Sequence, residues 1–283
     1  MIGGYAKRVP RAAIAAKIET YDNRAATFTT KMEIIPNDSS LFRAAIDALK
    51  DFLPEAQIQV RSTGITICGM DRSHVGFVHY QLAKADCKSL KIPVPQTIGM
   101  SLINLSRVLA NVGAGDSLRL SLNKTGDRLV VNYTNERIGK KAVYEIPMLE
   151  IIEDAAELPD LTYAAKISAK TSDIVGVIKE VGAFGDSVTL TLNEHGFHID
   201  ATGDMGSAKQ TLENTDDRDM ELTEDSVTAT YATKYISGIM KGCAPLSSTT
   251  ILEFDSSAQP LRVSFNYGTA SHFMAYLAPK IVD

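Results

Sequence analysis

Residues 41–71 read LFRAAIDALKDFLPEAQIQVRSTGITICGMD, a pattern typical of a helix that leads into strands. The apolar residues of the first twelve positions recur at helical period and predict one apolar stripe: Leu41, Ala45, Leu49 and Phe52. Asp38, Ser39 and Ser40 precede them and are candidate N-cap residues. Residues 64–67 then predict a strand that ends near Asp71.

This unit recurs along the chain. Further helices are predicted at 102–109, 172–181 and 233–241, so that the helix starts lie roughly 60 residues apart. Alternating strands follow them, and two of these strand pairs, 117–133 and 250–267, both end in Asn-Tyr. Two similar halves, each with two helices and several hairpins, predict an α+β fold. We expect two domains in which helices cover one face of antiparallel sheets.

Composition narrows the class of protein. The chain has 283 residues, of which 45% are apolar and 22% charged, so it can bury a sizeable core. The chain has 29 Lys and Arg against 34 Asp and Glu, a net charge of −5. This net negative charge argues against a protein that binds nucleic acid over its whole surface, but it allows a local basic face. The three cysteines, Cys68, Cys87 and Cys243, form no CxxC pair, so neither a disulfide framework nor a zinc site is indicated.

The first thirty residues differ from the rest. They hold five basic residues against two acidic ones, so the remainder of the chain carries 24 basic and 32 acidic residues. We interpret residues 1–30 as a basic N-terminal extension without a core of its own. A transit peptide is the rival reading, which Glu19 and Asp22 weaken. The acidic and apolar stretch 146–163 predicts an interdomain connector between domains at 31–145 and 164–283.

Enzyme signatures are absent from the sequence. It has no phosphate-binding loop, dinucleotide fingerprint, HExxH zinc motif or nucleophile elbow. Asp71, Ser73 and His74 lie within four positions, so a hydrolase that uses them remains an alternative hypothesis. Because triad residues usually come from separate elements, a polar turn is the favoured interpretation. His195 and His198 would face opposite sides of a strand, which suits no metal. We expect a non-enzyme that needs no metal and no cofactor.

Four segments resemble one family: residues 48–51 (ALKD), 69–75 (GMDRSHV), 244–249 (APLSST) and 276–281 (YLAPKI). They are similar to those of DNA sliding clamps of the proliferating cell nuclear antigen (PCNA) type, and the resemblance covers about residues 31–283. It implies a homotrimeric ring with helices inside and sheets outside. Such a clamp encircles duplex DNA without reading its sequence, works in the nucleus, is placed by a clamp loader and tethers DNA polymerases and repair proteins.

The resemblance also assigns residues to the inner, DNA-facing surface. These residues are basic and lie on or beside the predicted helices: Arg43, Lys50, Arg107, Lys170, Lys179, Lys234 and Lys241. Ala44, Ala110 and Gly176 stand where the family usually has Lys or Arg. Glu194 replaces the lysine that carries ubiquitin in eukaryotic clamps. These departures and the extension indicate a divergent or viral member.

Partner and subunit surfaces follow in the same way. The family docks a motif with a glutamine and two aromatics in a pocket under the connector, which matches Met70, His74, Val75, Phe77, Leu158, Pro159, Pro260, Tyr276, Ala278 and Pro279. Edge strands at 140–146 and 207–214 should join subunits head to tail, through Lys141, Val143, Tyr144, Ala208, Gln210 and Leu212. A subunit of a checkpoint ring or a monomeric viral processivity factor remains as an alternative.

Overall fold

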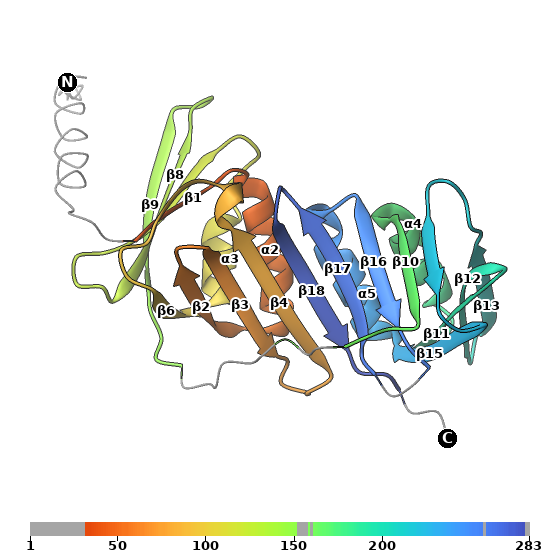
Figure 1. Ribbon diagram of the computed structural model, residues 1–283. Coiled ribbons are helices and arrows are strands. Elements are labelled where there is room, and N and C mark those ends of the chain that lie inside the picture. The colour runs from red at the N-terminus through yellow and green to blue at the C-terminus, as the bar shows by residue number, and fades with distance from the viewer. Residues whose placement is uncertain (1–31, 152–157, 159–160, 257–258, 281–283) are drawn as a thin grey trace, which may run out of the picture.

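The computed structural model describes residues 32–280 except 152–157, 159–160 and 257–258 (Figure 1). The predicted extension at 1–30 therefore lies outside the described residues. The four predicted helices are present as α2 (Ser39–Phe52), α3 (Leu102–Leu109), α4 (Thr171–Val181) and α5 (Thr233–Cys243), with short 3-10 helices η1 (Lys84–Asp86) and η2 (Ala244–Leu246). As predicted, the Asp38 side chain caps α2, and its Oδ1 accepts hydrogen bonds from the backbone N–H of Ser40 and Leu41 at 2.8 and 3.1 Å.

Strands follow each helix, as the repeat predicts. The N-terminal half holds β1 (Glu33–Pro36), β2 (Glu55–Arg61), β3 (Gly64–Met70), β4 (Gly76–Ala83), β5 (Cys87–Lys91), β6 (Gln96–Ser101), β7 (Ser117–Leu122), β8 (Arg128–Asn135) and β9 (Lys140–Pro147). The C-terminal half holds β10 (Ala165–Lys170), β11 (Ser187–Asn193), β12 (Gly196–Gly203), β13 (Gly206–Leu212), β14 (Asp219–Leu222), β15 (Ser226–Ala232), β16 (Thr249–Phe254), β17 (Leu261–Tyr267) and β18 (Ser271–Leu277).

These strands form three antiparallel sheets. Their orders are β5-β1-β7-β8-β9, β14-β10-β16-β17-β18-β4-β3-β2-β6 and β13-β12-β11-β15. The nine-stranded sheet runs through both halves of the chain, because β18 pairs with β4 from Leu277↔Gly76 to His272↔Gln81. The α+β class is confirmed. The two halves are thereby joined by a continuous ladder of backbone hydrogen bonds.

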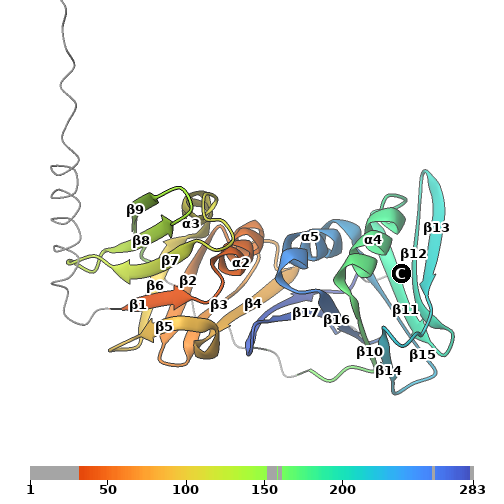
Figure 2. The same ribbon diagram turned by 90° about the horizontal axis from the view of Figure 1, so that it is seen from above.

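The helices lie in one layer on one side of the sheets (Figure 2). Along this layer α3 packs on α2, α2 on α5, and α5 on α4. The buried face of α2 is wider than the stripe predicted from the sequence. Phe42 and Ile46 are buried together with Ala45 and Leu49, whereas Leu41 and Phe52 are only half-buried. The face is wider because α2 contacts β4 and two other helices, so its apolar side chains span several rows, and Leu41 and Phe52 pack against the core at its margins.

Asp86, the last residue of η1, links the two halves of the chain through hydrogen bonds to residues 269–271. Its buried carboxylate accepts hydrogen bonds from the backbone N–H of Thr269, Ala270 and Ser271 at 2.6, 3.0 and 3.0 Å and from the Ser271 hydroxyl at 2.6 Å. Gly268 has φ +61°, and a Cβ there would lie 2.4 Å from Asp86 Oδ1, so the turn can approach this closely only with glycine.

We expect the Asp86→Ala variant to lose about 3 kcal/mol of unfolding free energy at pH 7, because four donors lose a charged acceptor in a buried place. Burial raises the pKa of Asp86, but the hydrogen bonds from Ser271, Ala270 and Thr269 outweigh it and lower the pKa below its usual value. The stabilisation is therefore fully present above the ordinary aspartate pKa near 3.9 and is lost as the pH falls through the lowered folded-state value.

Urea unfolding at several pH values checks this. The difference between wild type and Asp86→Asn should be constant from about pH 7 down to pH 5 and shrink below that. A pH-independent difference would contradict the role of the charged carboxylate.

Candidate DNA and partner interfaces

Seven basic residues were predicted to face DNA, and the structure places four of them on the exposed side of the helix layer. Arg107 lies on α3, Lys179 on α4, and Lys234 and Lys241 on α5. All four side chains are exposed, and none forms an ion pair with another described residue. Each of the three helices thus presents a free cation on the side away from the sheets.

The other three cations have partners within the chain. Arg43 Nη1 donates to the carbonyl oxygen of Val112 at 2.5 Å, which ties α2 to the end of α3. Lys50 Nζ lies 3.5 Å from the Asp47 carboxylate and 3.9 Å from Asp51. Lys170 Nζ lies 2.6 Å from Asp217 Oδ2, and this hydrogen bond raises the pKa of Lys170. The carboxylates beside Lys50 and Lys170 offset part of their positive charge, whereas Arg43 keeps its full charge and is held in place by a neutral carbonyl.

The predicted partner pocket is partly assembled by strand register. Met70, Phe77 and Tyr276 are directly opposed on β3, β4 and β18, and the rings of Phe77 and Tyr276 lie 5.7 Å apart. The backbone N–H of Ala278 donates to the carbonyl oxygen of Val75 at 2.9 Å, which brings the segment after β18 beside β4.

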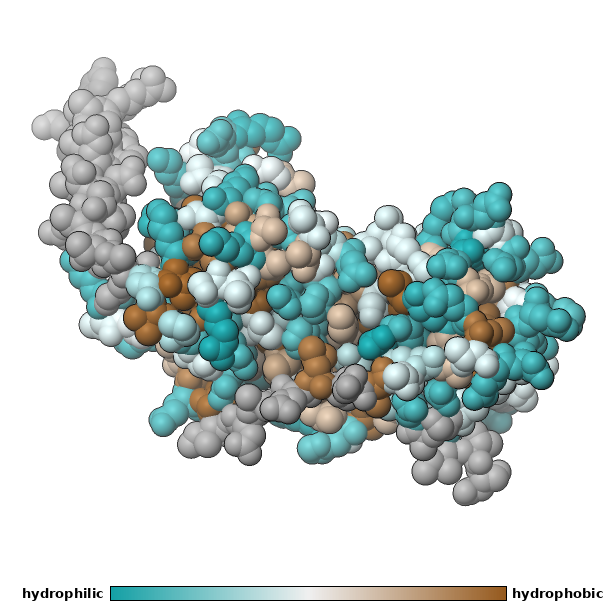
Figure 3. All heavy atoms as spheres, in the orientation of Figure 1, coloured by the Kyte–Doolittle hydropathy of each residue, from teal (hydrophilic) through white to brown (hydrophobic). Residues whose placement is uncertain are grey.

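The predicted pocket residues differ in how far their side chains are exposed to solvent. Met70 and Leu158 are 48% and 44% exposed, whereas Tyr276 is only 4% exposed and supports the surface from below. His74 and Ala278 are also exposed, and Val75, Pro260 and Pro279 are half-buried. Pro159 lies outside the described residues. Figure 3 shows this sheet side of the molecule, where apolar side chains form small separate groups among hydrophilic ones.

Asp71 organises the turn between Met70 and Val75. Its carboxylate accepts hydrogen bonds from the backbone N–H of Ser73, Val75 and Gly76 at 3.2, 2.8 and 2.6 Å, and the Tyr235 hydroxyl on α5 lies 3.4 Å away. Burial raises the pKa of Asp71, but these hydrogen bonds outweigh it and lower the pKa. Because the carboxylate is engaged by the backbone of its own turn, it is not oriented to assist His74, so the arrangement does not favour a hydrolase triad.

Strands β9 and β13 are edge strands, at opposite ends of the molecule (Figure 1). On β9, Lys141 and Val143 are exposed, and Tyr144 stacks on Tyr133 with the ring centroids 6.3 Å apart. On β13, Ala208 and Leu212 pack against the core, and Gln210 Nε2 donates to Glu180 Oε2 on α4 at 2.6 Å. Within the part of the chain that the structure describes, no strand pairs with the outer side of either edge.

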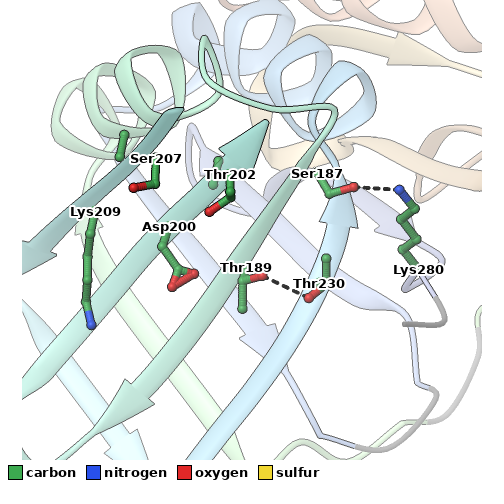
Figure 4. Close-up of a pocket in the computed structure, with 10 residues that line it drawn as sticks. Ser187, Thr189, Asp200, Thr202, Ser207, Lys209, Thr230 and Lys280 are labelled. Atoms are coloured by element: carbon green, nitrogen blue, oxygen red, sulfur yellow. Dashed lines mark hydrogen bonds between the residues drawn. The ribbon is translucent and has the colours of Figure 1, made fainter. Parts of the chain in front are cut away.

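Two cavities lie on the sheet side. One, of about 670 Å³, crosses the four-stranded sheet and is lined by polar side chains, including Asp200, Lys209 and Thr202 (Figure 4). Lys280 Nζ donates to the Ser187 hydroxyl at 2.8 Å at its rim. The second, of about 360 Å³, lies beside residues 161–164. No catalytic arrangement occupies either cavity, and among the described residues no three His, Cys, Asp or Glu side chains gather as a metal site.

The comparisons with known proteins agree with this geometry. Residues 31–157 match the family model "Proliferating cell nuclear antigen, N-terminal domain", and residues 157–280 match the C-terminal domain. The chain belongs to the PCNA family. A curated PCNA from Chaetomium thermophilum is 26% identical over 252 residues, covering 87% of this chain and 96% of the relative. The crystal structure of PCNA from Entamoeba histolytica matches with a TM-score of 0.82 and 25% identity, covering 89% of this chain and 100% of that one.

As a PCNA family member, the protein is a DNA sliding clamp and a polymerase processivity factor, and it is not an enzyme. The described part of the chain contains no helix long and apolar enough to cross a membrane.

Several side chains that contact the candidate site residues were not predicted from the sequence. The Asp47–Lys50 pair has the i, i+3 spacing of helical ion pairs and could have been predicted. Asp217 is 47 residues from Lys170 and the Tyr235 hydroxyl is 164 residues from Asp71, so no local spacing indicates either contact.

Proposed function

We propose that this clamp works as a homotrimeric ring whose helix layer surrounds duplex DNA. The observation that carries the proposal is the continuous layer α3-α2-α5-α4 with exposed cations on one side. At either end of the molecule lies an edge strand, β9 or β13, whose outer side pairs with no other strand among the described residues. Pairing β9 of one subunit with β13 of the next would extend the helix layer from subunit to subunit and remove both free edges.

Such a ring would hold DNA through phosphates alone. Arg107, Lys179, Lys234 and Lys241 would supply most of the attraction, because carboxylates partly neutralise Lys50 and Lys170 and a backbone carbonyl holds the Arg43 guanidinium. Phosphate contacts position a protein on DNA without reading the bases, so the ring can slide.

We further propose that the surface around Met70, Phe77, Leu158 and Tyr276 docks protein segments that carry a glutamine and two aromatic residues. Exposed apolar side chains above a buried aromatic pair support this proposal. DNA polymerases, a clamp loader and repair proteins are the partners that this mode implies, acting in the nucleus or in a viral replication compartment.

The ring is tested by the mass in solution. Wild type should have a mass of about 92 kDa, three times 30.6 kDa. Val143→Asp should give subunits of 30.6 kDa, because a carboxylate on the β9 edge would be desolvated without a partner charge. Light scattering after gel filtration at micromolar concentration measures both masses.

Val94→Asp is the matched control. Val94 is 68% exposed and Val143 is 61% exposed, but Val94 lies between β5 and β6 and is part of neither β9 nor β13. This variant should keep the wild-type mass. A monomeric wild type would contradict the homotrimer and favour a monomeric processivity factor, and a mixed ring that forms only with other clamp subunits would favour the checkpoint-type alternative.

A further inference from the structure

The loop between β13 and β14, residues 213–218, is anchored on the start of α4. Arg218 is half-buried, whereas the other residues of the loop are exposed, and its Nη2 lies 3.0 Å from the Asp173 carboxylate in the first turn of the helix. Its Nη1 donates to the carbonyl oxygen of Glu213 at 3.1 Å, and its backbone N–H donates to the carbonyl oxygen of Thr215 at 2.8 Å. These contacts hold the two ends of the loop together and fix it beside α4.

Asp217, next to this anchor, pairs with one of the predicted DNA-facing cations. Its Oδ2 lies 2.6 Å from Nζ of Lys170, the residue that directly precedes α4. This hydrogen bond lowers the pKa of Asp217 and raises the pKa of Lys170, so both groups are charged at neutral pH. The loop therefore supplies a partner of opposite charge for each of the two charged residues at the start of α4, Lys170 and Asp173.

Folding stability alone does not account for the pair of Lys170 with Asp217. Both side chains are exposed, and an ion pair between exposed groups contributes little to the free energy of unfolding. The anchor at Arg218 already holds the loop against α4. What the pair changes is the charge that the start of α4 presents to an approaching anion, because Asp217 covers the positive charge of Lys170.

Asp217 differs from the carboxylates beside Lys50 in the segment that carries it. Asp47 and Asp51 belong to the same helix as Lys50. Asp217 follows Lys170 by 47 residues and belongs to a loop, so its side chain can turn away without breaking a helix or a strand. A phosphate oxygen accepts a hydrogen bond from a lysine as a carboxylate oxygen does, and two anions beside one ammonium group repel each other. A phosphate can therefore replace Asp217 at the Lys170 Nζ.

We propose that Asp217 is an intramolecular competitor of the DNA phosphates for Lys170. The inference rests on the proposed function of the helix layer as the DNA surface. A phosphate gains the Lys170 contact only by displacing the Asp217 carboxylate, so the attraction at the start of α4 stays weak. Weak contacts to phosphates alone suit a ring that slides along the duplex.

The test is the Asp217→Asn variant, which removes the competing charge and keeps the size of the side chain. Anisotropy titrations of a labelled duplex with the full-length protein should show about fivefold tighter binding at 50 mM salt, because one lysine–phosphate contact becomes available. The slope of log K against log salt should become steeper by about one unit.

Asp216→Asn is the matched control. It makes the same change in net charge one residue earlier in the exposed loop, and none of the described residues forms an ion pair with Asp216. This variant should tighten DNA binding by less than about twofold, because charges that do not touch the phosphate contact are screened by salt.

The double variant Asp217→Asn with Lys170→Gln assigns the gain to Lys170. It has the net charge of wild type and should lose the fivefold gain, and thermal melts establish that all variants fold. A gain that persists without Lys170, or equal gains from Asp216→Asn and Asp217→Asn, would overturn the competitor role. An Asp217→Asn variant that binds like wild type would also overturn it but leave the helix layer as the DNA surface. If wild type binds no duplex even at 50 mM salt, the DNA surface is wrong, and the competitor role with it.

Discussion

Replacing Arg107, Lys179 and Lys241 by glutamate is expected to lower the affinity for duplex DNA by a hundredfold or more at 50 mM salt. These residues place one exposed cation on each of α3, α4 and α5. A charge pair 4 Å apart in water is worth about 1 kcal/mol, and reversal turns attraction into repulsion, so each lost contact changes the binding free energy by about 2 kcal/mol. Two contacts suffice for the expected loss.

Salt dependence gives the same variant a second readout. Each cation that contacts a phosphate contributes roughly one unit to the slope of log K against log salt, so the slope should become shallower. Anisotropy titrations of a labelled duplex between 50 and 200 mM salt measure both quantities.

The control reverses Arg61, Arg72 and Lys84, which are exposed on β2, on the turn after β3 and on η1. It makes the same change in net charge but touches none of the helices. If both triple variants bind DNA equally weakly, the helix layer is not the DNA surface, and only the net charge matters.

Truncating the exposed side of the partner surface, with Met70→Ser and Leu158→Ser together, is expected to weaken a docking peptide about thirtyfold. Apolar anchors that a partner covers contribute about 2 kcal/mol or more to binding. These two side chains are exposed in the free protein, so their truncation should cost little stability, whereas Tyr276 is buried and its truncation would disturb the fold.

Val94→Ser with Met205→Ser is the control for this variant, because these side chains are 68% and 77% exposed and lie between β5 and β6 and between β12 and β13, outside the residues assigned to the partner surface. The control should bind the peptide like wild type. DNA affinity should stay unchanged in both variants, since Met70 and Leu158 are not on the helix layer. Equal peptide affinities of the two variants would contradict the assignment of the docking surface to Met70 and Leu158.

Most helices and strands of the fold could be predicted from local sequence patterns. The helix at 102–109 and the strand at 117–122 follow from periods of 3.6 and 2, which depend only on which side chains must share a buried face. The cap at Asp38 follows in the same way, because an N-cap bonds to the two or three residues after it. The width of the buried face of α2 did not follow, since it depends on which elements pack around it.

The sequence by itself determined the repeated helix-and-strand units, the two similar halves and the family. It also marked where basic side chains lie on the helices. Only the tertiary structure decided which of those cations have a partner within the chain. Lys170 pairs with the Asp217 carboxylate, 47 residues away, and Arg43 donates to the Val112 carbonyl oxygen, 69 residues away. The tertiary structure also decided that Arg262 and Glu253 lie opposite Tyr276 on neighbouring strands, on the same sheet face as Met70. Strand register and loop placement bring these residues together, and both depend on long-range packing, which no local spacing records.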